Sequence, residues 1–147
     1  MIKTLIKKLQ SESESIPAFK LNLQPELPIF RIGHDLLNMA LENIIRNAIE
    51  ATDSNGEIII SSLLEDKFDP DKKSLNQWIN IEIIDNGTGI SEDDLKNIFT
   101  IGASIKPGGS GVGLSITKEI LTHFGGEIEI NSQLNLGTTV NIYLPTK

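Results

Sequence analysis

Residues 81–90 read IEIIDNGTGI, an isoleucine-rich strand that ends in an acidic residue and then turns on two glycines. An ionised carboxylate at the end of a buried strand, as Asp85 would be, only accepts hydrogen bonds and can take one from an exocyclic amine. Gly87 and Gly89 let backbone approach a flat ligand closely. Taken alone, the segment also fits an ordinary strand-to-helix turn with Asp-Asn-Gly chemistry. The segments on either side must therefore discriminate between a site and a turn.

Strands and helices surround this segment. Apolar residues at helical spacing predict helices at 1–10, 35–51, from 91 onward, and 112–124. Alternating apolar residues predict strands at 19–23, 29–32, 57–64, 78–84, 127–131 and 138–144.

The order of these elements predicts one α/β (α+β) domain over residues 1–147, with a motif-bearing core at 35–145. We expect a two-layer sandwich, in which a mixed, mostly antiparallel sheet of about five strands is covered on one face by about three helices. The strands at 57–64 and 78–84 should pair as a hairpin with a long connection, because residues 67–76 are polar and include Pro70. His34 or Asp35 stands where a cap of the second helix is expected.

Composition excludes several classes of protein. The 147 residues are 39% hydrophobic, including 24 isoleucines, which is enough for a sizeable core in one domain. With 13 basic and 20 acidic residues the net charge is −7, which disfavours general binding to nucleic-acid phosphates. Without cysteine there is no disulfide, Cys-ligated zinc or thiol nucleophile. No apolar run is long enough to span a bilayer, and residues 1–10 build no secretory signal.

The first helix is amphipathic, with lysines opposite its apolar positions. We assign residues 1–16 to an N-terminal helical segment whose main role is to cover the core, and expect it to make no membrane contact. A membrane-surface helix and the end of a preceding dimerisation segment are the alternatives.

Two further elements point to a polyphosphate ligand. Asn43 and Asn47 lie one helical turn apart, and their carbonyl oxygens can coordinate a hard cation such as Mg²⁺ or hold phosphate-bound waters; two ordinary exposed polar residues would show the same spacing. Residues 106–115 place glycines at alternate positions before a helix, which makes an anion cradle of backbone N–H groups, and Lys106 adds a point charge. Seven of the twelve glycines lie between Gly87 and Gly113. A flexible linker is the alternative for this stretch alone.

Together these elements resemble the GHKL superfamily of ATPases, which have the Bergerat fold, and within it the catalytic ATP-binding domain of sensor histidine kinases. Residues 42–51 (ENIIRNAIEA) look like the N box, 85–89 like the first glycine box and 98–100 like the F box. Gly109-x-Gly111-x-Gly113-Leu114 is similar to the second glycine box, and residues 137–139 to the terminal Gly-Thr pair. The motifs stand in the family order.

The resemblance implies specific roles. Asn47 would ligate Mg²⁺ and Asn43 would support the phosphate side, so both join Lys106 as the catalytic set. Asp85 would accept from the adenine amino group, with Gly89 against the ring and Thr139 assisting. Residues 100–109 would form a glycine-rich ATP lid that orders on nucleotide, and Gly111 and Gly113 would let it wrap the phosphates. The predicted nucleotide-binding set is completed by Gly87, Ile90, Phe99, Gly109, Gly111, Val112, Gly113 and Leu114.

The chain departs from the family pattern in two places. Residues 104–106 read Ser-Ile-Lys where two threonines and a lysine are common. Glu50 stands where many histidine kinases carry lysine, so Arg46 becomes the candidate phosphate contact on the N-box helix. The sequence of residues 47–51, Asn-Ala-Ile-Glu-Ala, is similar to that of the nitrogen-regulator type of sensor kinase.

Histidine transfer would need a partner. Neither His34, which starts the N-box helix, nor His123, near a helix end, has the helical-hairpin context of a phosphoacceptor. The resemblance therefore implies a cytoplasmic domain that binds ATP and Mg²⁺ and donates the γ-phosphoryl group to a separate phosphoacceptor and dimerisation domain, with a response regulator downstream. Two alternatives stay open: a stand-alone GHKL serine kinase that binds a sigma factor, and a regulatory module that binds nucleotide without transfer.

Overall fold

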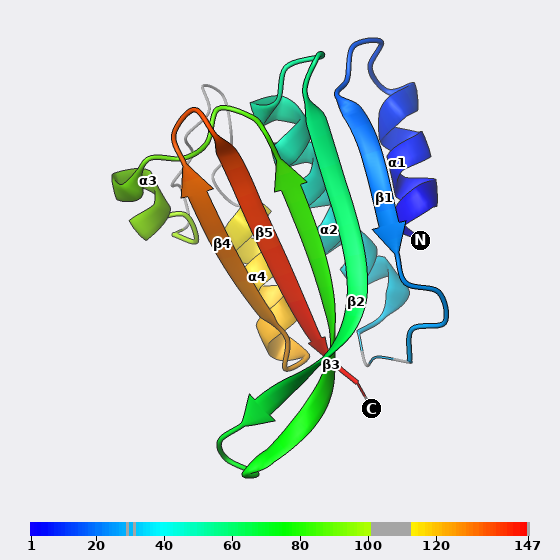
Figure 1. Ribbon diagram of the computed structural model, residues 1–147, viewed down its shortest axis with the longest axis vertical. Coiled ribbons are helices and arrows are strands. Elements are labelled where there is room, and N and C mark those ends of the chain that lie inside the picture. The colour runs from blue at the N-terminus through cyan, green and yellow to red at the C-terminus, as the bar shows by residue number, and fades with distance from the viewer. Residues whose placement is uncertain (29, 31, 101–112, 147) are drawn as a thin grey trace.

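The computed structural model describes residues 1–28, 30, 32–100 and 113–146. One five-stranded sheet of order β1-β2-β3-β5-β4 forms one layer, and helices cover one of its faces (Figure 1). The pair β1–β2 is parallel and the other three pairs are antiparallel. The strands are β1 (Ala18–Leu23), β2 (Glu57–Asp69), β3 (Ser74–Asp85), β4 (Glu127–Gln133) and β5 (Gly137–Pro145). The predicted mixed, mostly antiparallel sheet is confirmed.

The helices are α1 (Ile2–Ser11), α2 (His34–Ala51), α3 (Glu92–Lys96) and α4 (Gly113–His123). Helices α2 and α4 lie behind the sheet in Figure 1 and α1 lies beside the β1 edge, whereas the short α3 lies beyond the β4 edge. Helix α2 begins after Gly33, whose side chain can form no cap, so the predicted cap by His34 or Asp35 is wrong. Asp35 instead stands in the first turn, where the helix dipole favours an acid.

The core lies between the helices and the sheet. Alternate strand residues point to the helix side, including Ile58 and Ile60 of β2 and Ile83 of β3, all at most 1% exposed. The apolar faces of α1 and α2 close the same cluster. Leu5, Ile6 and Leu9 of α1 belong to it, so the first helix covers the core, as predicted. Within the described residues, no helix combines the length and hydrophobicity needed to cross a membrane.

The connection predicted at residues 67–76 is wrong. Strands β2 and β3 stay paired as far as Asp69 and Ser74, and the resulting ribbon projects beyond the rest of the sheet (Figure 1). The carboxylate of Asp69 accepts from the backbone N–H groups of Asp71 and Lys72 at 3.0 and 3.2 Å, which tightens the turn into four residues. At the ribbon's base the Lys67 ammonium lies 4.2 Å from the Tyr143 ring centroid. The charges and Pro70 in this segment indicated a loop, although strand β2 continues through Phe68.

Only part of the stretch at 29–32 is described. Phe30 forms an isolated antiparallel bridge with Thr146, and Ile32 is buried in the core. Ile29 and Arg31 lie outside the described residues. Residues 12–16 follow α1 without helical structure, so the helix is shorter than the assigned segment.

Candidate nucleotide-binding site

The carboxylate of Asp85 lies at the end of β3, on the helix-covered face of the sheet. It is 6% exposed, and its Oδ1 accepts from the Gly87 backbone N–H at 2.9 Å. Burial raises the pKa of this carboxyl, while the hydrogen bonds from the backbones of Gly87 and Thr138 act in the opposite direction. A buried hydrogen-bond acceptor at the end of a strand is the kind of group that can recognise an amine.

Glycines bring the turn after Asp85 against neighbouring backbone. A Cβ built on Gly87 would lie 2.2 Å from the carbonyl oxygen of Ala51, at the end of α2. Gly89 has φ +70°, and a Cβ there would lie 2.0 Å from the carbonyl oxygen of Gln133. No larger residue fits either place without moving backbone. These two glycines allow close approach of protein backbone. The predicted close approach of a flat ligand stays a prediction.

The turn between β4 and β5 holds the same loop from the other side. The Asn135 N–H donates to the Thr88 carbonyl at 2.7 Å, and the Ile90 N–H donates to Ser132 Oγ at 2.8 Å. The backbone of Ile90 is thus tied to β4, and its place in the nucleotide site stays a prediction. Gly137, at φ +125°, would place a Cβ 2.0 Å from the Asp85 carbonyl oxygen. The loop over 85–90 is fixed between α2 and the β4–β5 turn.

The register of β5 against β3 decides which threonine lies beside Asp85. Thr138 pairs with Asp85 and lies on the same, helix-covered face of the sheet. Thr139 pairs with Ile84, so the alternation of the strand directs it to the opposite face. The structure therefore does not bring the Thr139 side chain to Asp85. A strict count of alternation back from buried Val140 would have selected Thr138.

Asn43 projects from α2 toward the start of α4. Asn43 Nδ2 donates to the Gly113 carbonyl and to Thr117 Oγ1, both at 3.4 Å, so the side-chain oxygen is the atom left to face a ligand. Asn47 follows one turn later and is half-buried. Gly113 begins α4, and Asn43 is the nearest group to a Cβ built on it, at 3.9 Å. The N box and the end of the second glycine box are therefore adjacent.

Arg46 is held in an ion-pair network. Its guanidinium donates to Glu12 at 2.7 Å and to Glu42 at 2.8 Å, and these carboxylates raise the pKa of Arg46, Glu42 more than Glu12. Lys8 of α1 also reaches Glu42 at 3.0 Å. A polar hollow of about 400 Å³ beside α2 includes Asn43 and Arg46 in its lining. The predicted phosphate contact by Arg46 would compete with two carboxylates.

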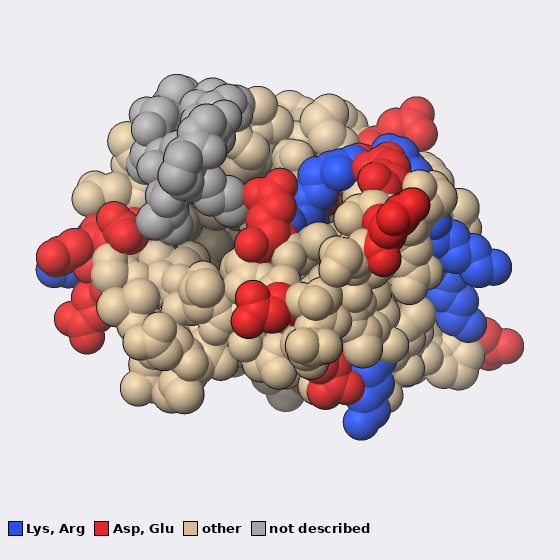
Figure 2. Space-filling view, turned by 90° about the horizontal axis from the view of Figure 1, so that it is seen from above, with Lys and Arg blue, Asp and Glu red and all other residues tan. Residues whose placement is uncertain are grey.

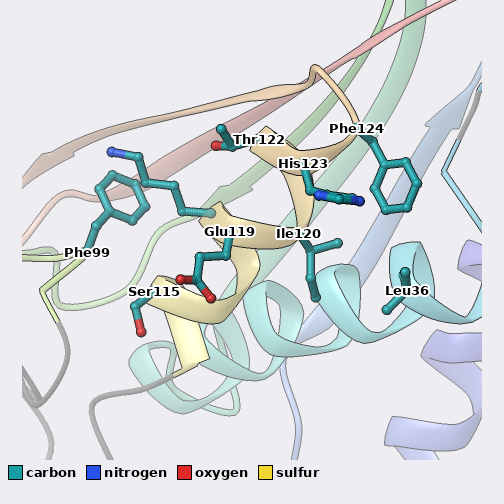
Figure 3. A pocket seen from close by; sticks show the side chains of 9 residues that line it. Leu36, Phe99, Ser115, Glu119, Ile120, Thr122, His123 and Phe124 are labelled. Carbon is teal, nitrogen blue, oxygen red and sulfur yellow. The ribbon is translucent and has the colours of Figure 1, made fainter.

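Two other predicted residues have different surroundings. Leu114 packs against the hydrophobic core. Phe99 lines a groove of about 700 Å³ on the outer side of α4, together with Ser115, Ile120 and Leu36 (Figure 3). The Lys118 ammonium lies 4.6 Å from the Phe99 ring centroid. Lys106, Gly109, Gly111 and Val112, and with them most of the predicted lid, lie outside the described residues.

Figure 2 looks onto the end of the molecule that carries Asp85. Acidic side chains lie in the middle of this surface beside a hollow, and basic side chains gather toward one side. A polyphosphate there would depend on backbone amides, a cation and nearby basic groups for its positive field.

Comparison with known proteins identifies the class. The family model described as "Histidine kinase-, DNA gyrase B-, and HSP90-like ATPase" matches residues 33–147, so the chain belongs to this ATPase family and is a nucleotide-binding domain. Within the family its relatives are sensor histidine kinases, and the chain corresponds to their ATP-binding catalytic domain. The predicted family is confirmed.

Two relatives illustrate the likeness in sequence. Sporulation kinase D of Bacillus subtilis is 34% identical over 111 residues, covering 76% of this chain and 20% of that protein. Sensor histidine kinase ZraS of Escherichia coli is 31% identical over 119 residues, covering 81% of this chain and 23% of that protein. The chain thus spans about a fifth of the length of such relatives.

Solved structures agree on the fold. The mycobacterial sensor histidine kinase MprB superposes with a TM-score of 0.76 at 21% identity, covering 98% of this chain and 91% of that one. The catalytic domain of histidine kinase ThkA gives 0.73 at 24% identity, with the same coverage. The predicted fold class is confirmed for the described residues.

Proposed function

We propose that this domain binds Mg-ATP and donates the γ-phosphoryl group to a histidine of a separate phosphoacceptor and dimerisation domain, which passes it to a response regulator. The observation that carries the proposal is the buried Asp85 carboxylate, fixed by backbone N–H donors beside glycine-lined turns. Such a group suits the amino edge of adenine. We place the domain in the cytoplasm, where ATP is the available donor.

The residues present fit a magnesium ion shared with a ligand. Amide oxygens are hard ligands of the kind Mg²⁺ accepts, and Asn43 keeps its oxygen available because its nitrogen is hydrogen-bonded. Asn47 would hold the ion and Asn43 would support the phosphate side. When bound, the ion would offset charge on the phosphate oxygens. Lys106 and the glycines of residues 109–113 remain proposed phosphate contacts.

Roles at the adenine side follow the strand register. Asp85 accepts from the amine, Gly89 permits close approach of the ring, and Thr138 takes the assisting role that sequence alone gave to Thr139. Phosphoryl transfer asks the protein mainly for positioning, to which these groups would contribute at the base, and for electrostatic stabilisation, which the proposed ion and phosphate contacts would supply. We propose that the nucleophile comes from the partner, because neither His34, at the start of α2, nor His123, at the end of α4, has the helical-hairpin context of a phosphoacceptor.

Calorimetry with Mg-ATP tests binding first. Asp85→Asn keeps the shape but loses the anionic acceptor, and a hydrogen bond to a charged group justifies an expected affinity loss of about tenfold or more. Asn47→Asp should alter the dependence of binding on Mg²⁺ concentration. Equal affinity of both variants and the parent would contradict the residue assignments.

Transfer is tested with labelled Mg-ATP and separately supplied phosphoacceptor hairpins of candidate kinases. An acid-labile phosphoprotein is expected, because phosphohistidine hydrolyses in acid. An acid-stable product would favour the serine-kinase alternative. Binding without transfer to any hairpin would favour the regulatory module.

A further inference from the structure

Ser132 lies where three segments of the site meet. Its hydroxyl oxygen accepts from the Ile90 N–H at 2.8 Å, lies 3.0 Å from the Gly137 carbonyl oxygen and lies 2.8 Å from Thr138 Oγ1. The adenine-side loop, the β4–β5 turn and the threonine beside Asp85 therefore share one side chain. Ser132 itself is half-buried in β4 and was not among the residues predicted from sequence.

Counting protons limits the directions that these bonds can take. A backbone N–H can only donate, so Ile90 occupies one lone pair of the Ser132 oxygen. A carbonyl oxygen can only accept, so Ser132 is the donor in its contact with Gly137, and we assign its single proton to that bond. The remaining contact, with Thr138, is then satisfied only when Thr138 donates its own proton to Ser132. All three partners are paired in this arrangement.

The direction of the Thr138 hydrogen bond determines what its hydroxyl can offer to a ligand. With its proton directed at Ser132, Thr138 presents only lone pairs to its other neighbours. The adjacent Asp85 carboxylate, to which the Thr138 backbone donates, is also an acceptor. This edge of the site is therefore built from acceptors, which favours a ligand or bridging water that donates and opposes a carbonyl.

We propose that Ser132 is a positioning residue that holds the Thr138 hydroxyl as an acceptor and thereby makes the site prefer a base with an amine over one with a carbonyl at that edge. The inference rests on the proposed nucleotide site. Without Ser132, the Thr138 proton is released and its hydroxyl can rotate to donate to a carbonyl.

The test compares ATP with inosine triphosphate, which carries a carbonyl in place of the adenine amine. Dissociation constants for both, with Mg²⁺, are measured by calorimetry on the parent, Ser132→Ala and Ser132→Thr. The parent should prefer ATP, and Ser132→Ala should reduce the preference about 3- to 10-fold, as expected for one reoriented hydrogen bond. Ser132→Thr, which keeps the hydroxyl, should restore it.

Ser61→Ala is the matched control, because the same substitution there lies on the uncovered face of β2 and should leave both constants unchanged. Thr138→Val removes the hydroxyl that Ser132 directs, so it should lower the preference as well, and the double variant Ser132→Ala/Thr138→Val should go no further. This second variant keeps the inference testable if Ser132→Ala folds poorly.

The outcomes separate the inference from the proposed function. Equal weakening of both nucleotides by Ser132→Ala would show a merely structural serine and overturn the inference alone. Additive effects of Ser132→Ala and Thr138→Val on the ratio would also overturn it. A parent that binds neither nucleotide would overturn the proposed function and the inference with it.

Discussion

Asp85 is the residue at which folding and the proposed binding of an amine make opposite demands. Burial favours the neutral carboxylic acid, and the pKa is raised for that reason, whereas recognition of an amine needs the anion. The backbone N–H groups of Gly87 and Thr138 reduce the conflict without removing it. A carboxylate that is kept in a place where burial disfavours its charge is typical of a functional site, where stability is lost in exchange for binding.

The pH dependence of stability follows from this conflict. With a folded-state pKa above its ordinary value of 3.8, Asp85 contributes stability below that value, and the contribution is lost as pH rises through the folded pKa. Asp85→Asn cannot ionise, so its free energy of unfolding relative to the parent should increase between pH 4 and pH 7. Urea denaturation of both proteins across this range measures it. A constant difference would contradict the raised pKa.

Gly89 gives a second prediction at the residue scale. Gly89→Ala should destabilise the domain by at least about 1 kcal/mol, because alanine is strained at positive φ and its Cβ would meet the Gln133 carbonyl oxygen. Nucleotide affinity should fall too, since the loop must shift. Gly33→Ala is the control for an added Cβ, because no atom of the described residues lies within 4 Å of a Cβ there. Thermal and urea unfolding compare the two variants.

The proximity of residues within one loop was the part of the candidate site that the sequence predicted best. Asp85, Gly87 and Gly89 lie together because their motif is contiguous and local geometry fixes it. Ser132 carried no such signal, since a lone serine in a strand becomes informative only after register places it beside Thr138. The error at Thr139 has the same origin. The motif at residues 137–139 indicates which residues lie near the site, whereas the pairing of β5 with β3 decides which face of the sheet each side chain occupies.

At the scale of elements, the ribbon formed by the ends of β2 and β3 differs most from expectation. Pro70 and the charges around it indicated a loop, but Pro70 lies in the turn outside both strands, where its missing N–H costs no ladder bond. Phe68 and Leu75 face each other there and are 61% and 67% exposed. They bury little area, so the ribbon contributes little to the core.

Shortening the ribbon should therefore be tolerated. Replacing residues 68–75 by Asn-Gly leaves Lys67 and Asn76 as the last pair around a two-residue turn. We expect a change in stability below about 1 kcal/mol, since little apolar surface is lost, and Mg-ATP affinity within twofold of the parent. Asp85 lies at the other end of β3, away from the ribbon (Figure 1). A fivefold loss of affinity would show that the ribbon supports the site.

Helices α1 and α2 are joined by charge as well as by packing. Hydrogen bonds from Arg46 first, and Lys8 second, lower the pKa of Glu42 below its ordinary 4.5. The stability from this carboxylate is present above pH 4.5 and is lost as pH falls through its folded pKa.

Glu42→Gln should reduce stability at pH 7 by about 1 kcal/mol or less, because the network is partly exposed to solvent. The difference from the parent should shrink toward pH 3 and in high salt, which urea denaturation at two pH values and two salt concentrations measures. Lys3→Gln, on the exposed side of α1, is the control. A difference insensitive to both pH and salt would mean that Glu42 acts through packing.

At the scale of the whole molecule, the fold follows from the order of its apolar patterns. Isoleucine-rich strands and three amphipathic helices define the two layers, and the α1 face that sequence left open between core and membrane is buried against α2. What sequence did not predict is how β3 and β5 become neighbours. Their pairing joins Asp85 to Thr138 across a long stretch of chain, and no local pattern encodes that register.

That pairing has a consequence for how the domain folds. Strands β2–β3 and β4–β5 are each local hairpins that can close early, whereas joining them at Asp85 and Thr138 requires closing a much longer loop. The proposed adenine-side site is complete only once both hairpins have met. A bound nucleotide should therefore slow unfolding in proportion to its affinity while leaving the rate of refolding unchanged. The ligand would stabilise the domain once it has folded and would take no part in its folding.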